Sequence, residues 1–173
     1  ATLTTDRFGN VDAAYNFDGT NDFIQTNLEL NNPPYSIRFL FNADVDSKKQ
    51  SIIDSDNENE YGHSIILGYG SLDNTIDVQY HDGYYNSPFV YQPGIWYEVV
   101  ATFDLGEVKL YVDGTFIGNK IHNQSLINGL NLRFGRHNPN GPQWYDGAID
   151  EVSVWNRILN DQEIIQLYNE SYN

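Results

Sequence analysis

Residues 144–168 read WYDGAIDEVSVWNRILNDQEIIQLY, and this stretch contains an acidic turn, a strand and a short helix in succession. The dipeptide Asp146-Gly147 is typical of a turn. The apolar residues after it recur in partial alternation, which predicts a strand with one buried face. These apolar residues are Ile149, Val152, Val154 and Trp155.

The same stretch ends in the clearest helix signal of the chain. Asn160 is a suitable N-cap residue, and Glu163 follows three positions later, as the reciprocal hydrogen bonds of a capping box require. Ile164, Leu167 and Tyr168 then fall on one apolar face. The sequence therefore predicts a helix over residues 160–169.

The rest of the chain consists of short apolar or alternating segments that are separated by turn residues. Residues 35–41 and 108–112 alternate, and the second segment ends at Asp113-Gly114, a hairpin turn signal. Further strands are predicted at residues 14–17, 23–24, 51–53, 64–67, 75–80, 96–103, 115–118 and 130–135. Strands at this spacing predict an all-β fold, a sandwich of two antiparallel sheets.

Length and composition indicate one domain. The chain has 173 residues and contains no internal linker, so we predict a single domain over residues 1–173. Because the chain begins with Ala1 rather than Met, we expect a processed or excised fragment. It has no apolar run as long as a membrane span, and we expect no membrane insertion. Cysteine is absent, which excludes disulfides and thiolate metal sites.

The formal net charge is -15, from 24 acidic against 9 basic residues. Nucleic acids and anionic membranes are bound mainly through cationic groups, so this charge argues against both as partners. It favours an extracellular, cation-rich medium, calcium as a bound ion, and a neutral ligand over a polyanionic one.

Four blocks of sequence follow one another in an order that is typical of one known family. Residues 6–10 and 15–24, DRFGN and YNFDGTNDFI, form the first block. The second is WYEVVATFD and VKLYVDG at residues 96–104 and 108–114, and the third is LRFGR at 132–136. The last is DGAIDEV at 146–152 with NRIL at 156–159. These blocks resemble laminin G-like, concanavalin A-like jelly-roll domains.

The resemblance implies a two-sheet antiparallel jelly-roll sandwich with one short C-terminal helix. Members of this family usually carry a further strand before the segment that corresponds to Arg133-Phe134-Gly135. Here that strand is missing or lies upstream of Ala1. We therefore expect an unpaired sheet edge or the loss of some ligands of a metal site.

The resemblance also implies a structural calcium ion where the first and last strands meet. Asp18, Asn21 and Asp22 form an oxygen-rich turn, and Asp150 would enter from the C-terminal strand. Calcium binds oxygen ligands, including backbone carbonyls, in irregular geometry. The alternative is that Asp18 simply holds its own turn and that Asp150 is hydrogen-bonded to loop amides.

A second acidic cluster lies at Asp54, Asp56, Asn57, Glu58 and Glu60. It lacks the glycine and the terminal glutamate of a helical calcium-binding loop. Because runs of charge usually face water, we predict a solvated acidic loop here rather than a cation site.

Two aromatic clusters are candidates for ligand binding. One surrounds a glycine turn at residues 80–86, and the other follows the loop at residues 136–143. A flat aromatic ring can stack on the apolar face of a sugar while polar side chains bind its hydroxyl groups. We predict Trp144, Tyr84 and Tyr85 as stacking residues and His81, Asp82, Arg136, His137, Asn140 and Gln143 as their polar partners. The alternative for each tyrosine is packing against neighbouring strands.

These features predict a non-catalytic carbohydrate-binding module of a secreted or cell-surface protein, with a polysaccharide or glycan as its partner. Two alternatives stay open, because one fold supports many functions. One is an adhesin or protein-interaction domain. The other is a small polysaccharide lyase or glycoside hydrolase, although no complete catalytic constellation is recognisable. The paired acidic pattern of the laminarinase-like enzymes is absent, and Gln79-Tyr80-His81 matches only part of the alginate-lyase-type arrangement.

Overall fold

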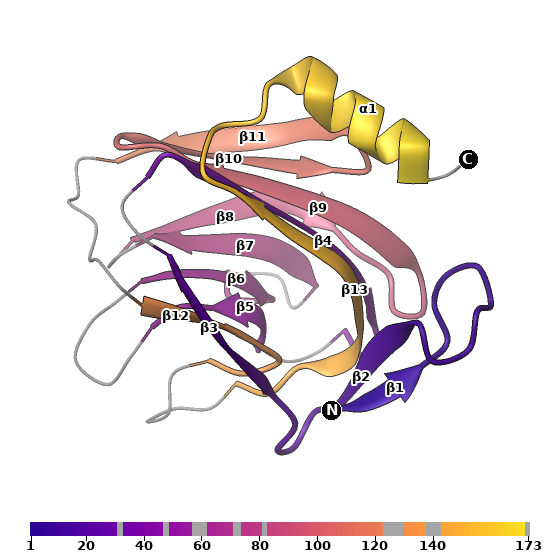
Figure 1. The fold of residues 1–173 in the computed structure, drawn as a ribbon. Coiled ribbons are helices and arrows are strands. Elements are labelled where there is room, and N and C mark those ends of the chain that lie inside the picture. Colours follow the sequence, from indigo (N-terminus) through magenta and orange to yellow (C-terminus); the bar gives the residue numbers. More distant parts are fainter. Residues whose placement is uncertain are drawn as a thin grey trace.

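Two antiparallel sheets are stacked face to face, and one helix lies on the outer face of the larger sheet (Figure 1). The computed structural model of the chain describes residues 1–30, 33–46, 49–56, 62–70, 74–80, 83–122, 130–137 and 143–171. The predicted all-β, two-sheet sandwich with a C-terminal helix is confirmed.

The larger sheet, sheet A, has seven strands in the order β1-β2-β13-β4-β9-β10-β11. In this order the strands are β1 (Thr2–Thr4), β2 (Ala14–Asp18), β13 (Asp146–Trp155), β4 (Tyr35–Ala43), β9 (Trp96–Phe103), β10 (Glu107–Val112) and β11 (Thr115–Ile121). The central position of β4 agrees with its sequence, since Ile37, Phe39 and Phe41 alternate into the core.

The smaller sheet, sheet B, has six strands in the order β3-β12-β5-β6-β7-β8. These are β3 (Ile24–Leu30), β12 (Leu130–Phe134), β5 (Gln50–Asp54), β6 (His63–Leu67), β7 (Thr75–Tyr80) and β8 (Gly83–Val90). All residues of β5, β6 and β7 are buried, including the polar ones. The outer face of sheet B is therefore covered at these three central strands, whereas β3 and β8 at its edges are partly exposed.

Helix α1 (Asp161–Ser171) starts where its capping signal predicts. The backbone N–H of Asn160 donates to the Glu163 carboxylate at 2.9 Å, and that of Glu163 donates back to the Asn160 side chain at 3.0 Å. Ile164 and Leu167 pack with Leu159 in a small second core, which also contains Val100 of β9 and Tyr111 of β10. The helix is thus held against sheet A by its apolar face.

No helix in the described parts of the chain is long and apolar enough to cross a membrane.

Candidate functional site

A row of side chains crosses sheet B from edge to edge on its outer face. Residues directly opposite each other in antiparallel strands project to the same face. The register places six such neighbours in line: Gln25, Arg133, Asp54, Ser64, Gln79 and Tyr84. The adjacent row, Ile24, Phe134, Ile53, Ile65, Val78 and Tyr85, faces the core. One shift in register would exchange the two rows, so the apolar row fixes the polar one.

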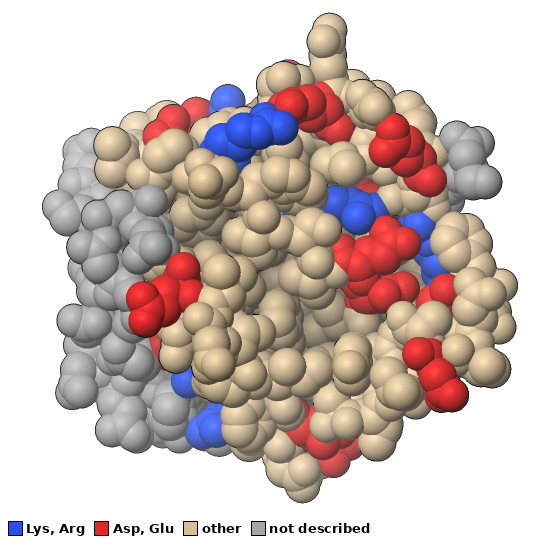
Figure 2. Space-filling model, in the orientation of Figure 1, with Lys and Arg blue, Asp and Glu red and all other residues tan. Residues whose placement is uncertain are grey.

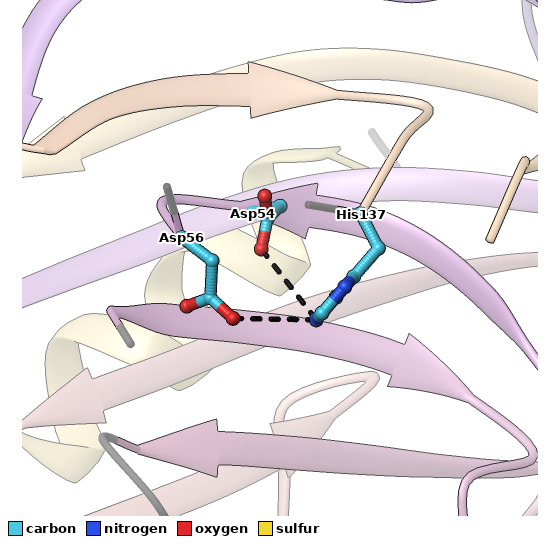
Figure 3. A group of neighbouring side chains, drawn as sticks. All are labelled: Asp54, Asp56 and His137. Carbon is cyan, nitrogen blue, oxygen red and sulfur yellow. Dashed lines mark ion pairs between the residues drawn. The ribbon is translucent and has the colours of Figure 1, made fainter. Parts of the chain in front are cut away.

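At the centre of the polar row, Asp54 belongs to a group that also contains the carboxylate of Asp56 and the imidazole of His137 (Figure 3). The Nε2 atom of His137 lies 3.3 Å from the Asp56 carboxylate and 3.9 Å from that of Asp54. Gln79 donates to Asp56 at 3.1 Å, and its amide oxygen lies 3.2 Å from the same His137 nitrogen. The three groups offer one nitrogen and two oxygen ligand atoms, all within 4.8 Å of one another.

The two aspartates are fully enclosed, with 0% of Asp54 and 2% of Asp56 exposed. The Arg133 guanidinium forms an ion pair with Asp54 and donates to the backbone carbonyl of Asp56. The Ser64 hydroxyl donates to Asp54 at 2.6 Å. Buried carboxylates need such partners, because desolvation of an unpaired charge is costly.

For Asp54 and Asp56, the prediction of a solvated acidic loop was wrong. Asp54 is the last residue of β5, and Arg133 of β12 lies directly opposite it. A charge run indicates a wet surface only when no cation is placed to neutralise it, and that placement depends on strands distant in sequence. Asn57, Glu58 and Glu60 lie outside the described residues.

Burial raises the pKa of Asp54, and the neighbouring charge of Asp56 adds to this rise. His137, Ser64 and Arg133 act in the opposite direction. A donor set of imidazole and carboxylates suits zinc or a related transition metal better than calcium, which favours oxygen alone. The group can therefore hold a metal ion, and His137 is the predicted ligand-binding residue that belongs to it.

A second candidate surface combines two aromatic rings with one guanidinium. The Arg136 guanidinium lies 5.2 Å from the ring centroid of Phe23 and 5.1 Å from that of Trp144. The two rings are 6.4 Å apart. Phe23 is 41% exposed, and Trp144 is partly exposed. We call these three residues the aromatic platform.

Two polar atoms at this platform lack partners. Nε of Arg136 and the side-chain oxygen of Gln143 are buried, and neither has a hydrogen-bond partner among the residues that the structure describes. One is a donor and the other an acceptor. The structure thus brings the predicted residues Trp144, Arg136 and Gln143 to one place. It adds Phe23, which was predicted only as part of a strand.

Of the two predicted tyrosines, one faces outward and the other inward. Tyr84 stacks on Tyr69, with ring centroids 3.9 Å apart, and Lys49 lies 4.4 Å from the Tyr69 ring centroid. Tyr85 packs against the core, and burial raises its pKa. Strand alternation forces this difference between consecutive residues. His81, Asp82 and Asn140 lie outside the described residues.

The four residues predicted as calcium ligands are distributed over two places. The Asp18 carboxylate accepts the backbone N–H groups of Asn21, Thr20 and Asp22, at 2.9–3.2 Å, and these bonds lower its pKa. Asp146, rather than Asp150, lies opposite Asp18. Asp150 is four residues further along β13, roughly 13 Å away for extended backbone. It accepts the N–H of Glu151 at 2.7 Å.

The sequence matches the profile of the concanavalin A-like lectin/glucanases superfamily over residues 18–165. The chain belongs to this superfamily. The resemblance in the four sequence blocks is therefore confirmed. No curated protein matched the sequence.

Three solved structures illustrate how this superfamily fold recurs. Domain 4 of a GH43 extracellular arabinanase from Geobacillus stearothermophilus, in complex with arabinotriose, has a TM-score of 0.71 and 17% identity over 90% of this chain and 76% of its own. A putative carbohydrate binding protein from Bacteroides ovatus has 0.71 and 18%, over 88% and 46%. The receptor binding domain of botulinum neurotoxin D has 0.72 and 17%, over 92% and 44%. At these identities the likeness shows the fold alone.

Proposed function

We propose that this lectin-like domain is a non-catalytic carbohydrate-binding module of a secreted or cell-surface protein. The aromatic platform of Phe23, Arg136 and Trp144 is the observation that supports this most directly. Its rings offer an apolar surface to the C–H face of a sugar. Arg136 and Gln143 are partly exposed side chains that carry hydrogen-bond donors and an acceptor for sugar hydroxyl groups.

Two further observations agree with a glycan partner. A domain with a net charge of -15 repels polyanions, so neutral polysaccharides suit it best. Two of the similar structures are described as carbohydrate-binding or contain a bound oligosaccharide. One of them belongs to an extracellular enzyme, and we propose an extracellular location for this domain too.

Replacing Trp144 by Ala should weaken glycan binding by about tenfold, which corresponds to the loss of one stacking contact. Affinity electrophoresis of the purified domain in gels that contain a panel of neutral polysaccharides, arabinan among them, measures this. Phe116→Ala is the matched control, because Phe116 is a half-exposed ring in β11, which lies at the opposite edge of sheet A. If the parent domain is retarded by none of the polysaccharides, the proposal fails.

The group Asp54, Asp56 and His137 favours a second candidate, a glycoside hydrolase or polysaccharide lyase. Two adjacent carboxylates with a raised pKa on one of them are typical of acid–base catalysis. Their full enclosure and the Arg133 ion pair argue against this role, since a substrate must reach the reacting groups. The enzyme hypothesis would be favoured if the domain released new sugar ends from a polysaccharide that it binds, and if His137→Ala abolished this release.

For the structural calcium ion, we propose the turn of Asp18, Asn21 and Asp22, with Asp146 as the carboxylate from β13. The Asp146 side chain lies against Gly19, where an added Cβ would come within 2.9 Å of it. Backbone carbonyls of the turn would complete an oxygen-only set, as calcium prefers. The mixed nitrogen and oxygen group at His137 would serve a different metal.

A further inference from the structure

A groove opens between the two sheets along the side of the sandwich where residues of β3 and β13 line the same cavities. One wall is β3, the edge strand of sheet B, and the other is the second half of β13. Two cavities follow one another along these strands. The first, of about 280 Å³, lies between Ile24 and Val152, and the second, of about 410 Å³, lies between Leu28 and Val154. Figure 2 shows the hollow, with acidic side chains on both of its sides.

Both walls of the groove have strand edges that no described strand occupies. In sheet A, β2 pairs with β13 only at residues 146–149. Beyond that point β13 pairs with β4 alone, at Asp150 and, after a bulge at Glu151 and Val152, from Ser153 to Trp155. In sheet B, β3 pairs with β12 and has no strand on its other side among the described residues. Free edges present backbone N–H and C=O groups that can bind an added strand.

The interior of the groove is apolar and opens onto the core. The core residues Phe17, Phe134 and Ile149 line the first cavity. At its mouth, Val152 is 38% exposed and Leu28 is 46% exposed. Side chains that project from an added strand toward the core would remove this apolar surface from water.

The rim of the groove carries negative charge. Glu29 belongs to β3, and Asp150 and Glu151 belong to β13. Glu151 is already bound by Arg38 at 2.9 Å and faces Arg7 at 3.8 Å. For Glu29 and Asp150, no cation lies within ion-pair distance among the described residues, so these two carboxylates select a cationic occupant. A second copy of this chain would bring another charge of -15 and is disfavoured.

We propose that this groove binds an extended segment of a partner protein, in which apolar residues alternate with lysine or arginine. The segment adds a strand to the free edge of β13. Its apolar side chains enter the two cavities, and its basic side chains project to the outer face of sheet A, the face on which Asp150 lies because Ile149 beside it points into the core. This goes beyond the proposed carbohydrate binding and uses a different surface.

The test measures fluorescence polarisation of a short labelled peptide of alternating lysine and valine, titrated with the whole domain. We expect saturable binding that weakens with salt, and no binding of the matched peptide of alternating glutamate and valine. Val152→Lys should weaken binding about tenfold or more. Ile121→Lys is the control, because Ile121 is an exposed residue of β11, the opposite edge strand of sheet A. Asp150→Asn should weaken binding and reduce its salt dependence.

Methylation of backbone nitrogens tests strand addition itself. In an extended peptide the N–H groups of the valines point to one edge and those of the lysines to the other. Methylating one set should abolish binding, whereas methylating the other set should preserve it. Equal tolerance of both sets would overturn the proposal, as would binding that Val152→Lys leaves unchanged.

Sedimentation of the domain alone tests whether a second copy of the chain occupies the groove instead. A dimer that Val152→Lys dissociates would show that a second copy fills the groove, and would also overturn the proposal. Polysaccharide retention of the Val152→Lys variant should equal that of the parent domain, so the two functions are tested separately.

Discussion

At the scale of single residues, the charges enclosed on sheet B are the most consequential feature. Asp54 is completely buried and depends on one guanidinium, that of Arg133. Removing one partner of a buried pair leaves an uncompensated charge, which costs far more than the net value of the pair. Loss of Arg133 should therefore destabilise the domain, because the buried carboxylate of Asp54 would be left unpaired.

We predict that Arg133→Met destabilises the domain by roughly 3–5 kcal/mol. Urea unfolding followed by tryptophan fluorescence gives this value. The double variant Arg133→Met, Asp54→Asn should recover part of the loss, because it no longer buries an unpaired carboxylate. Arg157→Met serves as the control, since Arg157 forms an exposed ion pair with Glu163 that contributes little.

The same variant has a definite pH dependence. In the parent, burial raises the pKa of Asp54 above its ordinary value of 3.8. A carboxyl whose folded pKa is raised stabilises the fold when protonated, and this contribution is lost as the pH rises through the folded pKa. Loss of Arg133 strengthens the effect. The stability difference between the variant and the parent should therefore shrink as the pH falls toward 3.8. A stability difference that is independent of pH would show that the unpaired carboxylate of Asp54 is not the cause of the destabilisation.

At the scale of secondary-structure elements, α1 shows that signals close together in sequence can predict where a helix begins. The Asn160 and Glu163 capping box appears in the structure as both reciprocal hydrogen bonds. The Arg157 guanidinium binds the same Glu163 carboxylate with two bonds, at 2.8 and 2.7 Å. The start of the helix was predictable because all of these groups lie within seven residues of sequence.

We predict that Asn160→Ala lowers the free energy of unfolding by about 1 kcal/mol through loss of the N-cap. Urea denaturation compares it with Gln162→Ala, a first-turn residue outside the capping box. An equal effect of both changes would show that helix propensity, and not capping, is responsible.

The Glu163 carboxyl of the capping box also titrates. The Arg157 side chain, together with the N–H of Asn160, lowers the pKa of Glu163 from 4.5 to about 2. A lowered carboxyl pKa stabilises the fold above the unfolded value and loses this effect as the pH falls through the folded value. Fraying of α1 should therefore increase between pH 4.5 and about 2, as monitored by amide exchange at residues 161–164. Glu163→Gln should remove this dependence.

At the scale of the whole molecule, the two sheets are joined by the core and by the meeting of β2 with β13. The groove shows that this meeting is incomplete, because β2 leaves β13 after Ile149. The proposed calcium ion at Asp18 would stabilise the part that is formed. The group at His137 would stabilise sheet B with a different metal.

Chelation should therefore lower the melting temperature of the domain. A ligand at one hundred times its Kd contributes about 2.7 kcal/mol to stability. Differential scanning calorimetry after removal of metals, with calcium or zinc added back, measures the effect of each. Asp18→Asn should remove the response to calcium, and His137→Ala the response to zinc. A melting curve that chelation leaves unchanged would exclude both ions.

Much of the fold was predictable because its signals are local. Alternation in β4, the Asp113-Gly114 turn and the capping box each depend on residues that are close in sequence. The helix was predicted over 160–169 and spans Asp161–Ser171. Trp144 and Arg136 could be selected as candidates because their residue types suit a sugar, although their type did not show what they contact.

The remaining features depend on strand register between distant segments. Asp54 and Arg133 are 79 positions apart, and pairing of β5 with β12 makes them neighbours. Phe23 joins Trp144 for the same reason, since β3 brings it to the end of β12. The sequence alone was enough for the class of fold, the helix and its cap, because short-range forces decide those. Which charges are buried, which aromatic rings meet and which strand edges stay open followed from the packing of two sheets, because register and burial are long-range properties.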